Sequence, residues 1–123
     1  MIMELLPVDP ERQLGIVPPR LRFTPECAAL VNFLQWQFCY EDDLDVVKRV
    51  IAEVKRGDRE RDMLINHRGS HAEITASTAE IYDASLDEEG VLATEMPLAQ
   101  FERIIEIWRA HCRDEQFVGT FEV

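Results

Sequence analysis

Residues 71–84 read HAEITASTAEIYDA, and apolar and polar side chains alternate along both halves of this stretch. A period of two places successive side chains on opposite faces of a β-strand. We therefore expect strands over 71–76 and 79–84 that form a hairpin with its turn at Ser77-Thr78. The side chains expected to face the core are those of Ala72, Ile74, Ala79 and Ile81. Those expected to face solvent are Glu73, Thr75, Glu80 and Tyr82.

Two more strands extend this hairpin into an antiparallel meander of about four strands over residues 61–96. Residues 63–67 are expected to form the strand before the hairpin, with a turn at 68–70. Residues 91–96 are expected to form the strand after it, and the polar residues 87–90 (DEEG) supply the turn that leads into this last strand.

Two helices follow from apolar residues spaced three and four apart. The first has acidic residues at its start and Gly57 after its basic end, which is the order that helix ends favour. Its apolar face is predicted to consist of Leu44, Val47, Val50, Ile51 and Val54. The second helix covers 97–112, begins at Pro97 and should cover one face of the sheet. Its apolar stripe is predicted to consist of Leu98, Phe101, Ile104, Ile105, Trp108 and Cys112.

Residues 24–40 allow two interpretations. Thr24 as the N-cap and Pro25 as the first helical residue indicate a helix that runs to Phe38. The competing interpretation is a strand over 34–40, where apolar side chains alternate with two glutamines. The start signal favours the helix.

The two ends of the chain carry weaker patterns. Residues 1–23 hold four of the six prolines, so we expect irregular structure there with short extended pieces at 3–6 and 21–23. Residues 116–123 form either a terminal strand or a frayed tail.

A chain of 123 residues has the size of one domain. We predict a single α+β domain, in which an antiparallel β-meander packs against two or three helices. Its parts are an extended segment over 1–23, a helical region over 24–57, the meander over 61–96, the helix over 97–112 and the strand or tail over 116–123.

The acidic excess excludes two classes of partner. Against 24 Asp and Glu the chain has 13 Lys and Arg, a formal net charge of −11, and residues 63–123 carry 12 acidic and 4 basic groups. Such a surface repels phosphate, so we expect neither direct nucleic-acid binding nor docking to an anionic membrane. No stretch reaches the roughly 20 apolar residues of a membrane span, and no signal-peptide pattern opens the sequence.

The cysteines and histidines predict no metal, cofactor or catalytic residue. Cys27, Cys39 and Cys112 are odd in number, lack CxxC spacing and lie in apolar stretches, which indicates a reducing, cytoplasmic setting and small buried side chains. His67 and His71 are four apart but flank a predicted turn, so exposed histidines are the favoured interpretation over a metal site. Phosphate-binding glycine motifs and nucleophile elbows are missing from the sequence.

The outer face of the predicted hairpin and its adjoining turn are strongly acidic. One interpretation is ordinary solvated charge; the functional one is a surface that meets lysines and arginines of a basic partner, with Tyr82 as the central anchor. The candidate partner-binding residues are Glu73, Glu80, Tyr82, Asp83, Asp87, Glu88 and Glu89. The acidic helix start at residues 41–45 is the alternative interface.

The order of elements over residues 61–112 resembles a known family. It consists of the strands 71–75 and 79–83, the acidic turn at 87–89, and the segment MPLAQF at 96–101 leading to the IEIW at 105–108. This order resembles small bacterial immunity proteins of contact-dependent growth inhibition and polymorphic toxin systems.

The resemblance implies a non-enzymatic protein that binds and neutralises a cognate toxin domain, commonly a nuclease. A nuclease needs a basic groove for phosphate, which an acidic protein can occupy. Two other classes stay open: a small cytoplasmic regulatory or adaptor protein that forms a homodimer, and, last, an enzyme of unknown chemistry.

Overall fold

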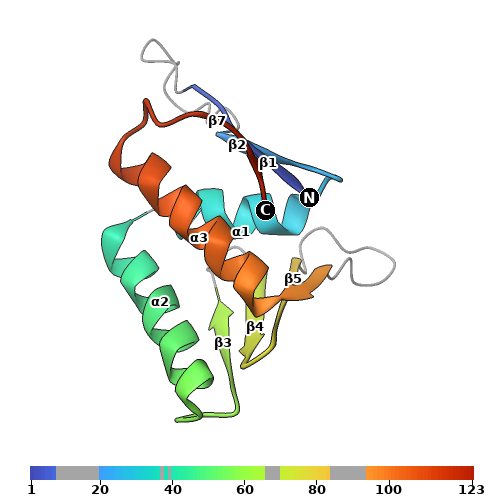
Figure 1. Cartoon of the computed structure of the whole chain (residues 1–123), viewed down its shortest axis with the longest axis vertical. Helices are drawn as coiled ribbons and strands as arrows, with labels where there is room; N and C mark the ends of the chain where they lie inside the picture. The colour runs from blue at the N-terminus through green and yellow to red at the C-terminus, as the bar shows by residue number, and fades with distance from the viewer. Residues whose placement is uncertain (8–19, 37, 39, 66–69, 84–93) are drawn as a thin grey trace.

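The computed structural model describes residues 1–7, 20–36, 38, 40–65, 70–83 and 94–123 of the chain (Figure 1). Its helices and strands, in chain order, are β1 (Ile2–Leu5), β2 (Leu21–Thr24), α1 (Ala28–Trp36), α2 (Glu41–Arg56), β3 (Arg61–Ile65), β4 (Ser70–Thr75), β5 (Thr78–Asp83), β6 (Thr94–Pro97), α3 (Leu98–Arg113) and β7 (Gly119–Glu122). The predicted α+β class with an antiparallel meander is confirmed.

The meander is a four-stranded antiparallel sheet with the order β3-β4-β5-β6. The residues expected to face the core are all fully buried, namely Ala72, Ile74, Ala79 and Ile81. The hairpin turn lies at Ala76-Ser77 and not at Ser77-Thr78, because the Thr78 amide donates to Thr75 Oγ1 (3.0 Å) and Thr78 thereby begins β5. The predicted strand over 91–96 is only partly tested, because residues 91–93 lie outside the described residues.

A second, three-stranded sheet joins the two ends of the chain. Its order is β2-β1-β7, so β1 lies in the middle and pairs antiparallel with both neighbours. The extended pieces expected near 3–6 and 21–23 are confirmed as β1 and β2. The open choice at the C-terminal end is decided by β7, which pairs with β1.

Helix α1 lies between the two sheets (Figure 1). The helical interpretation of this segment is confirmed, but the predicted start at Pro25 is wrong. Thr24 ends β2 and pairs with Ile2, so its backbone belongs to the sheet and the helix begins only at Ala28. The predicted end at Phe38 is also wrong: α1 ends at Trp36.

Helix α2 matches its prediction. The five apolar residues of its predicted face are the buried ones, and Glu41, Asp42 and Asp43 occupy its first turn. Gly57 has a φ of 83° and closes the helix through backbone hydrogen bonds, a conformation that favours glycine. The helix packs on β3, β4 and α3.

Helix α3 covers the sheet as expected and contacts β5, β6 and α2 (Figure 1). Its predicted start at Pro97 is wrong by one residue, because Pro97 ends β6 and pairs with Thr78, so the helix begins at Leu98. Trp108 is fully buried, and its indole Nε1 donates to the Phe38 carbonyl (2.8 Å). One residue of the predicted stripe is corrected: Cys112 is half-buried, whereas His111 is fully buried in its place. The chain after α3 causes this difference, because the Phe117 carbonyl supplies a partner for the His111 ring.

Candidate functional site

A row of three glutamates crosses the open face of the four-stranded sheet. Glu73 on β4 lies directly opposite Glu80 on β5, and Glu80 lies directly opposite Glu95 on β6. Neighbouring strands lie about 4.8 Å apart, so the three carboxylates are adjacent. We call Glu73, Glu80 and Glu95 the glutamate row.

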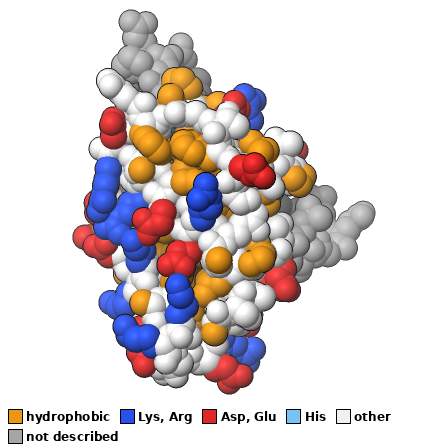
Figure 2. Space-filling view, in the orientation of Figure 1, with side chains coloured by type: hydrophobic (Ala, Val, Ile, Leu, Met, Phe, Trp, Pro, Cys, Tyr) orange, Lys and Arg blue, Asp and Glu red, His pale blue; other side chains and the backbone are white. Residues whose placement is uncertain are grey.

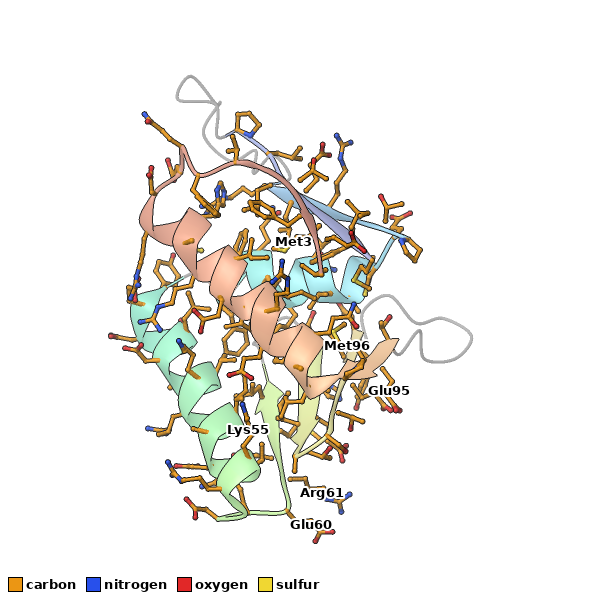
Figure 3. The ribbon with its side chains drawn as sticks, in the orientation of Figure 1. Met3, Lys55, Glu60, Arg61, Glu95 and Met96 are labelled. Carbon is orange, nitrogen blue, oxygen red and sulfur yellow. The ribbon has the colours of Figure 1, made fainter. Side chains whose placement is uncertain are left out.

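The glutamate row lies on the side of the sheet away from its buried residues. Along β4 and β5 every second residue is buried, and Glu73 and Glu80 occupy the alternating, half-buried positions. On β6, Glu95 is exposed while its neighbour Met96 is buried, so the two point to opposite faces (Figure 3). Both predicted solvent-facing glutamates of the hairpin therefore lie where expected.

The charge of this row is mostly uncompensated within the described part of the chain. Arg61 Nη1 lies 3.4 Å from Glu73 Oε1. Glu80 and Glu95 have no cation within ion-pair distance in the part of the chain that the structure describes. Like charges directly opposite each other destabilise a sheet. Repulsion within the row therefore lowers the stability of the isolated protein. Binding of a basic partner would relieve that repulsion.

Two rings border the glutamate row on the same face. His71 on β4 and Tyr82 on β5 are Cα partners, one step along the face from Glu73 and Glu80, and their rings meet edge to face at 74°. Tyr82 lies on the outer face as predicted and is half-buried. His71 is half-buried as well, which corrects the expectation of an exposed histidine; His67 lies outside the described residues.

Asp83 does not belong to this surface, contrary to the prediction. It is 3% exposed and accepts hydrogen bonds from Ser70 Oγ (2.8 Å) and Asn32 Nδ2 (3.0 Å). The reason is strand parity: Asp83 follows Ile81 by two residues and so shares its buried face. The carboxylate ties α1 to β4 and β5. The predicted turn acids Asp87, Glu88 and Glu89 lie outside the described residues.

Two residues of the site were missed by sequence reasoning. Glu95 joins the row because β6 pairs with β5 in a register that brings it opposite Glu80. Met63 stands opposite Glu73 at the other end of the row and is 44% exposed. Alternation alone could have placed Glu95 on the outer face of its strand, but only the register shows its neighbour.

The alternative acidic interface at the start of α2 is partly neutralised internally. Arg109 Nη2 lies 2.9 Å from Glu41 and 2.7 Å from Asp45, and Arg113 binds Glu41 with two nitrogens. The Arg113 guanidinium lowers the pKa of Glu41, with a smaller contribution from Arg109. Glu41 and Asp45 already have cations, which makes them poorer candidates for a basic partner than Glu80 and Glu95, whereas Asp42 and Asp43 have no ion pair among the described residues.

The same compensation extends along the groove between α2 and α3. The groove has a volume of about 340 Å³, with Ile51 and Ile105 among its lining residues. Lys55 spans it to Glu102 (3.1 Å), and Lys48 spans it to Glu106. Figure 2 shows basic and acidic side chains interspersed over this face.

Metal and membrane features are not found in the described residues. No three His, Cys, Asp or Glu side chains there are grouped as metal ligands. Cys27 is buried with its Sγ 3.3 Å from Thr94 Oγ1, and Cys112 is half-buried; Cys39 lies outside the described residues. None of the described helices combines the length and apolar character needed to cross a membrane.

Comparisons of the chain with protein-family models, with curated proteins and with solved structures give no match. The candidate site is therefore defined by its own geometry: an acidic row on a rigid sheet, bordered by Tyr82, His71 and Met63.

Proposed function

We propose that this chain is a non-enzymatic immunity protein that binds and neutralises a basic toxin domain, with a nuclease as the favoured kind of toxin. The single observation that supports this proposal best is the pair of adjacent carboxylates, Glu80 and Glu95, that lack cations in the described part of the chain. A partner that places a lysine or arginine between them would remove their repulsion and gain a charge-assisted hydrogen bond.

The overall charge supports the same class of partner. A net charge of −11 attracts a basic domain over a distance and accelerates its encounter with the sheet. A nuclease carries positive charge in its substrate groove, because that groove must hold phosphate. The acidic protein would occupy or border that groove and exclude the substrate.

The borders of the row supply the less polar contacts that an interface centre needs. Tyr82 is a rigid amphipathic ring held against His71, and Met63 is a flexible exposed side chain at the other end. Aromatic residues in such positions commonly carry much of the binding energy. Asp87, Glu88 and Glu89 stay as predicted rim residues, and the protein is expected to act in the cytoplasm without a cofactor.

A homodimeric regulatory or adaptor protein is the competing function. In a two-fold dimer each patch meets its own copy. The glutamate row would then oppose a second glutamate row, so a dimer would need another face. This repulsion favours the basic partner for the open face of the sheet.

The test is co-purification with the product of the gene adjacent to the one that encodes this chain, with affinity measured at low and high salt. Reversal of the two uncompensated charges (E80K with E95K) is expected to weaken binding by about 2–5 kcal/mol and to lower the salt dependence of association. The matched control is E26K with E60K, which reverses two exposed acids outside the row.

Equal affinity of the two double variants would contradict the placement of the interface. Tyr82→Ala is expected to cost about 2 kcal/mol or more of binding energy if the ring is an anchor. Failure of the neighbouring product to bind, together with a dimeric mass in solution, would favour the regulatory interpretation.

A further inference from the structure

The C-terminal strand β7 is attached to α3 through a buried histidine. His111 lies in the last turn of α3 and is fully buried, and its Nδ1 lies 2.8 Å from the Phe117 carbonyl, just before β7. Since a carbonyl can only accept, Nδ1 carries the proton and donates it. In the neutral ring, Nε2 then carries a lone pair and no hydrogen.

The surroundings of His111 oppose a positive charge. Its Nε2 is buried without a hydrogen-bond partner among the described residues, and so is Nε of Arg20. The Arg20 guanidinium lies over the Trp108 ring at 5.2 Å, and the His111 ring lies 5.6 Å from the same indole. Arg20, from the segment before β2, is thus the cation that faces the imidazole.

Two carboxylates in the turn after α3 favour the positively charged form of His111. Glu115 lies 4.0 Å from Arg20, and Asp114 ends the helix beside His111. Burial nevertheless lowers the pKa of His111, and Arg20 adds to that effect, while the hydrogen bond to Phe117, Glu115 and Asp114 act against it. The net direction keeps the ring neutral near pH 7.

Strand β7 is held by its pairing with β1 and by one aromatic side chain. Phe121 stacks on Phe117 and packs against the core, while the other residues of β7 are half-buried or exposed. Arg103 Nε donates to the Glu122 carbonyl (3.1 Å) and Gln100 Nε2 donates to the Val123 carbonyl (3.2 Å). No residue of β7 is fully buried, and a terminal strand with limited burial opens locally at a lower free-energy cost than the core.

We propose that protonation of His111 at acidic pH releases β7 and its connection to α3 from the rest of the fold. Protonation of His111 adds a charge beside Arg20 and an Nε2–H donor that has no acceptor in the part of the chain that the structure describes. Opening the connection at Phe117 lets the imidazolium reach water. Release of β7 then uncovers the edge of β1 to which it is paired.

The experiment follows the exchange of individual amide hydrogens by NMR from about pH 7.5 to about pH 5.5, after correction for the intrinsic exchange rate. When β7 is open, the His111 ring reaches water and has its ordinary pKa of 6.5. It then binds a proton that it does not bind when β7 is in place. The opening constant of β7 is therefore expected to rise by up to about tenfold over this range. Amides of Ala72 and Ile74, in the central strand β4, should stay protected.

His111→Asn is the informative variant, because its amide can still donate to the Phe117 carbonyl but does not titrate. Exchange from β7 in this variant should be independent of pH after correction, whereas the control His71→Asn should keep the acid response of the unaltered protein. An acid response that survives in His111→Asn would overturn the proposal. So would a uniform response of β7 and β4, which would indicate global unfolding.

The imidazole signal of the unaltered protein gives a second measurement that needs no variant at His111. It should titrate below 6.5, together with the opening of β7, and Arg20→Gln should move that titration upward. Titration of His111 without any change in exchange from β7 would overturn the proposal.

Discussion

Replacing Glu80 with glutamine should stabilise the isolated protein, because Glu80 is the central member of the glutamate row. Two carboxylates lie directly opposite it, Glu73 on one side and Glu95 on the other. At a separation of about 6 Å each like-charge pair costs about 0.7 kcal/mol in water. Arg61 offsets part of the Glu73 charge, so we expect Glu80→Gln to raise the free energy of unfolding by about 0.5–1.5 kcal/mol.

The assay is thermal and urea unfolding at about 0.02 M and about 1 M NaCl. For a domain of this size, the gain corresponds to an increase in Tm of about 2–6 °C at low salt. At high salt the Debye length falls to about 3 Å, so most of the gain should disappear. The control is Glu60→Gln, which removes one exposed acid outside the row. The reasoning is refuted if both variants gain equally, if Glu80→Gln is destabilising, or if its gain persists at high salt.

The remaining predictions concern buried side chains and the loss of stability at acidic pH. Trp108→Ala should cost about 3–5 kcal/mol of unfolding free energy, because it leaves a cavity under α3 and removes the donor to Phe38; a variant that melts like the wild type contradicts this burial. Asp83→Ala should cost about 2–3 kcal/mol, because Ser70 and Asn32 lose their acceptor; urea midpoints compared with those of the exposed control Glu60→Ala measure it, and equal midpoints would mean that the network contributes nothing. The folded-state pKa of Glu41 is lowered from its ordinary 4.5, so its contribution to stability is present above that pH and is lost as the pH falls through the folded value. In Glu41→Gln, the free energy of unfolding should therefore fall less steeply with pH below about pH 4.5. An unchanged pH dependence would show that the pairs with Arg113 and Arg109 are screened.

The periodic elements could be predicted from the sequence because their pattern is local. Alternation over 71–84 identifies the buried face of the hairpin, and spacing by three and four identifies the buried faces of α2 and α3. Each of these patterns depends on neighbours within one or two turns of chain, which the sequence lists in order. The same parity argument, applied one step further, would have placed Asp83 inside.

The boundaries and the ends of the chain depended on tertiary contacts. Thr24 has the composition of an N-cap, yet its backbone pairs with Ile2, and this pairing with a distant strand delays the start of α1. His111 replaces Cys112 in the buried stripe because the Phe117 carbonyl lies beside its ring and accepts a hydrogen bond from Nδ1. Strand β7 forms because β1, at the other end of the chain, offers an unpaired edge.

The candidate site combines both kinds of information. Composition and alternation by themselves determined that the protein is acidic and that Glu73, Glu80 and Tyr82 share an outer face. Only the tertiary structure decided that Glu95 stands beside Glu80 and that, of the described arginines and lysines, Arg61 alone forms an ion pair with the glutamate row. The physical reason is that strand register and ion pairing join residues far apart in sequence, while side-chain alternation is a property of each strand alone.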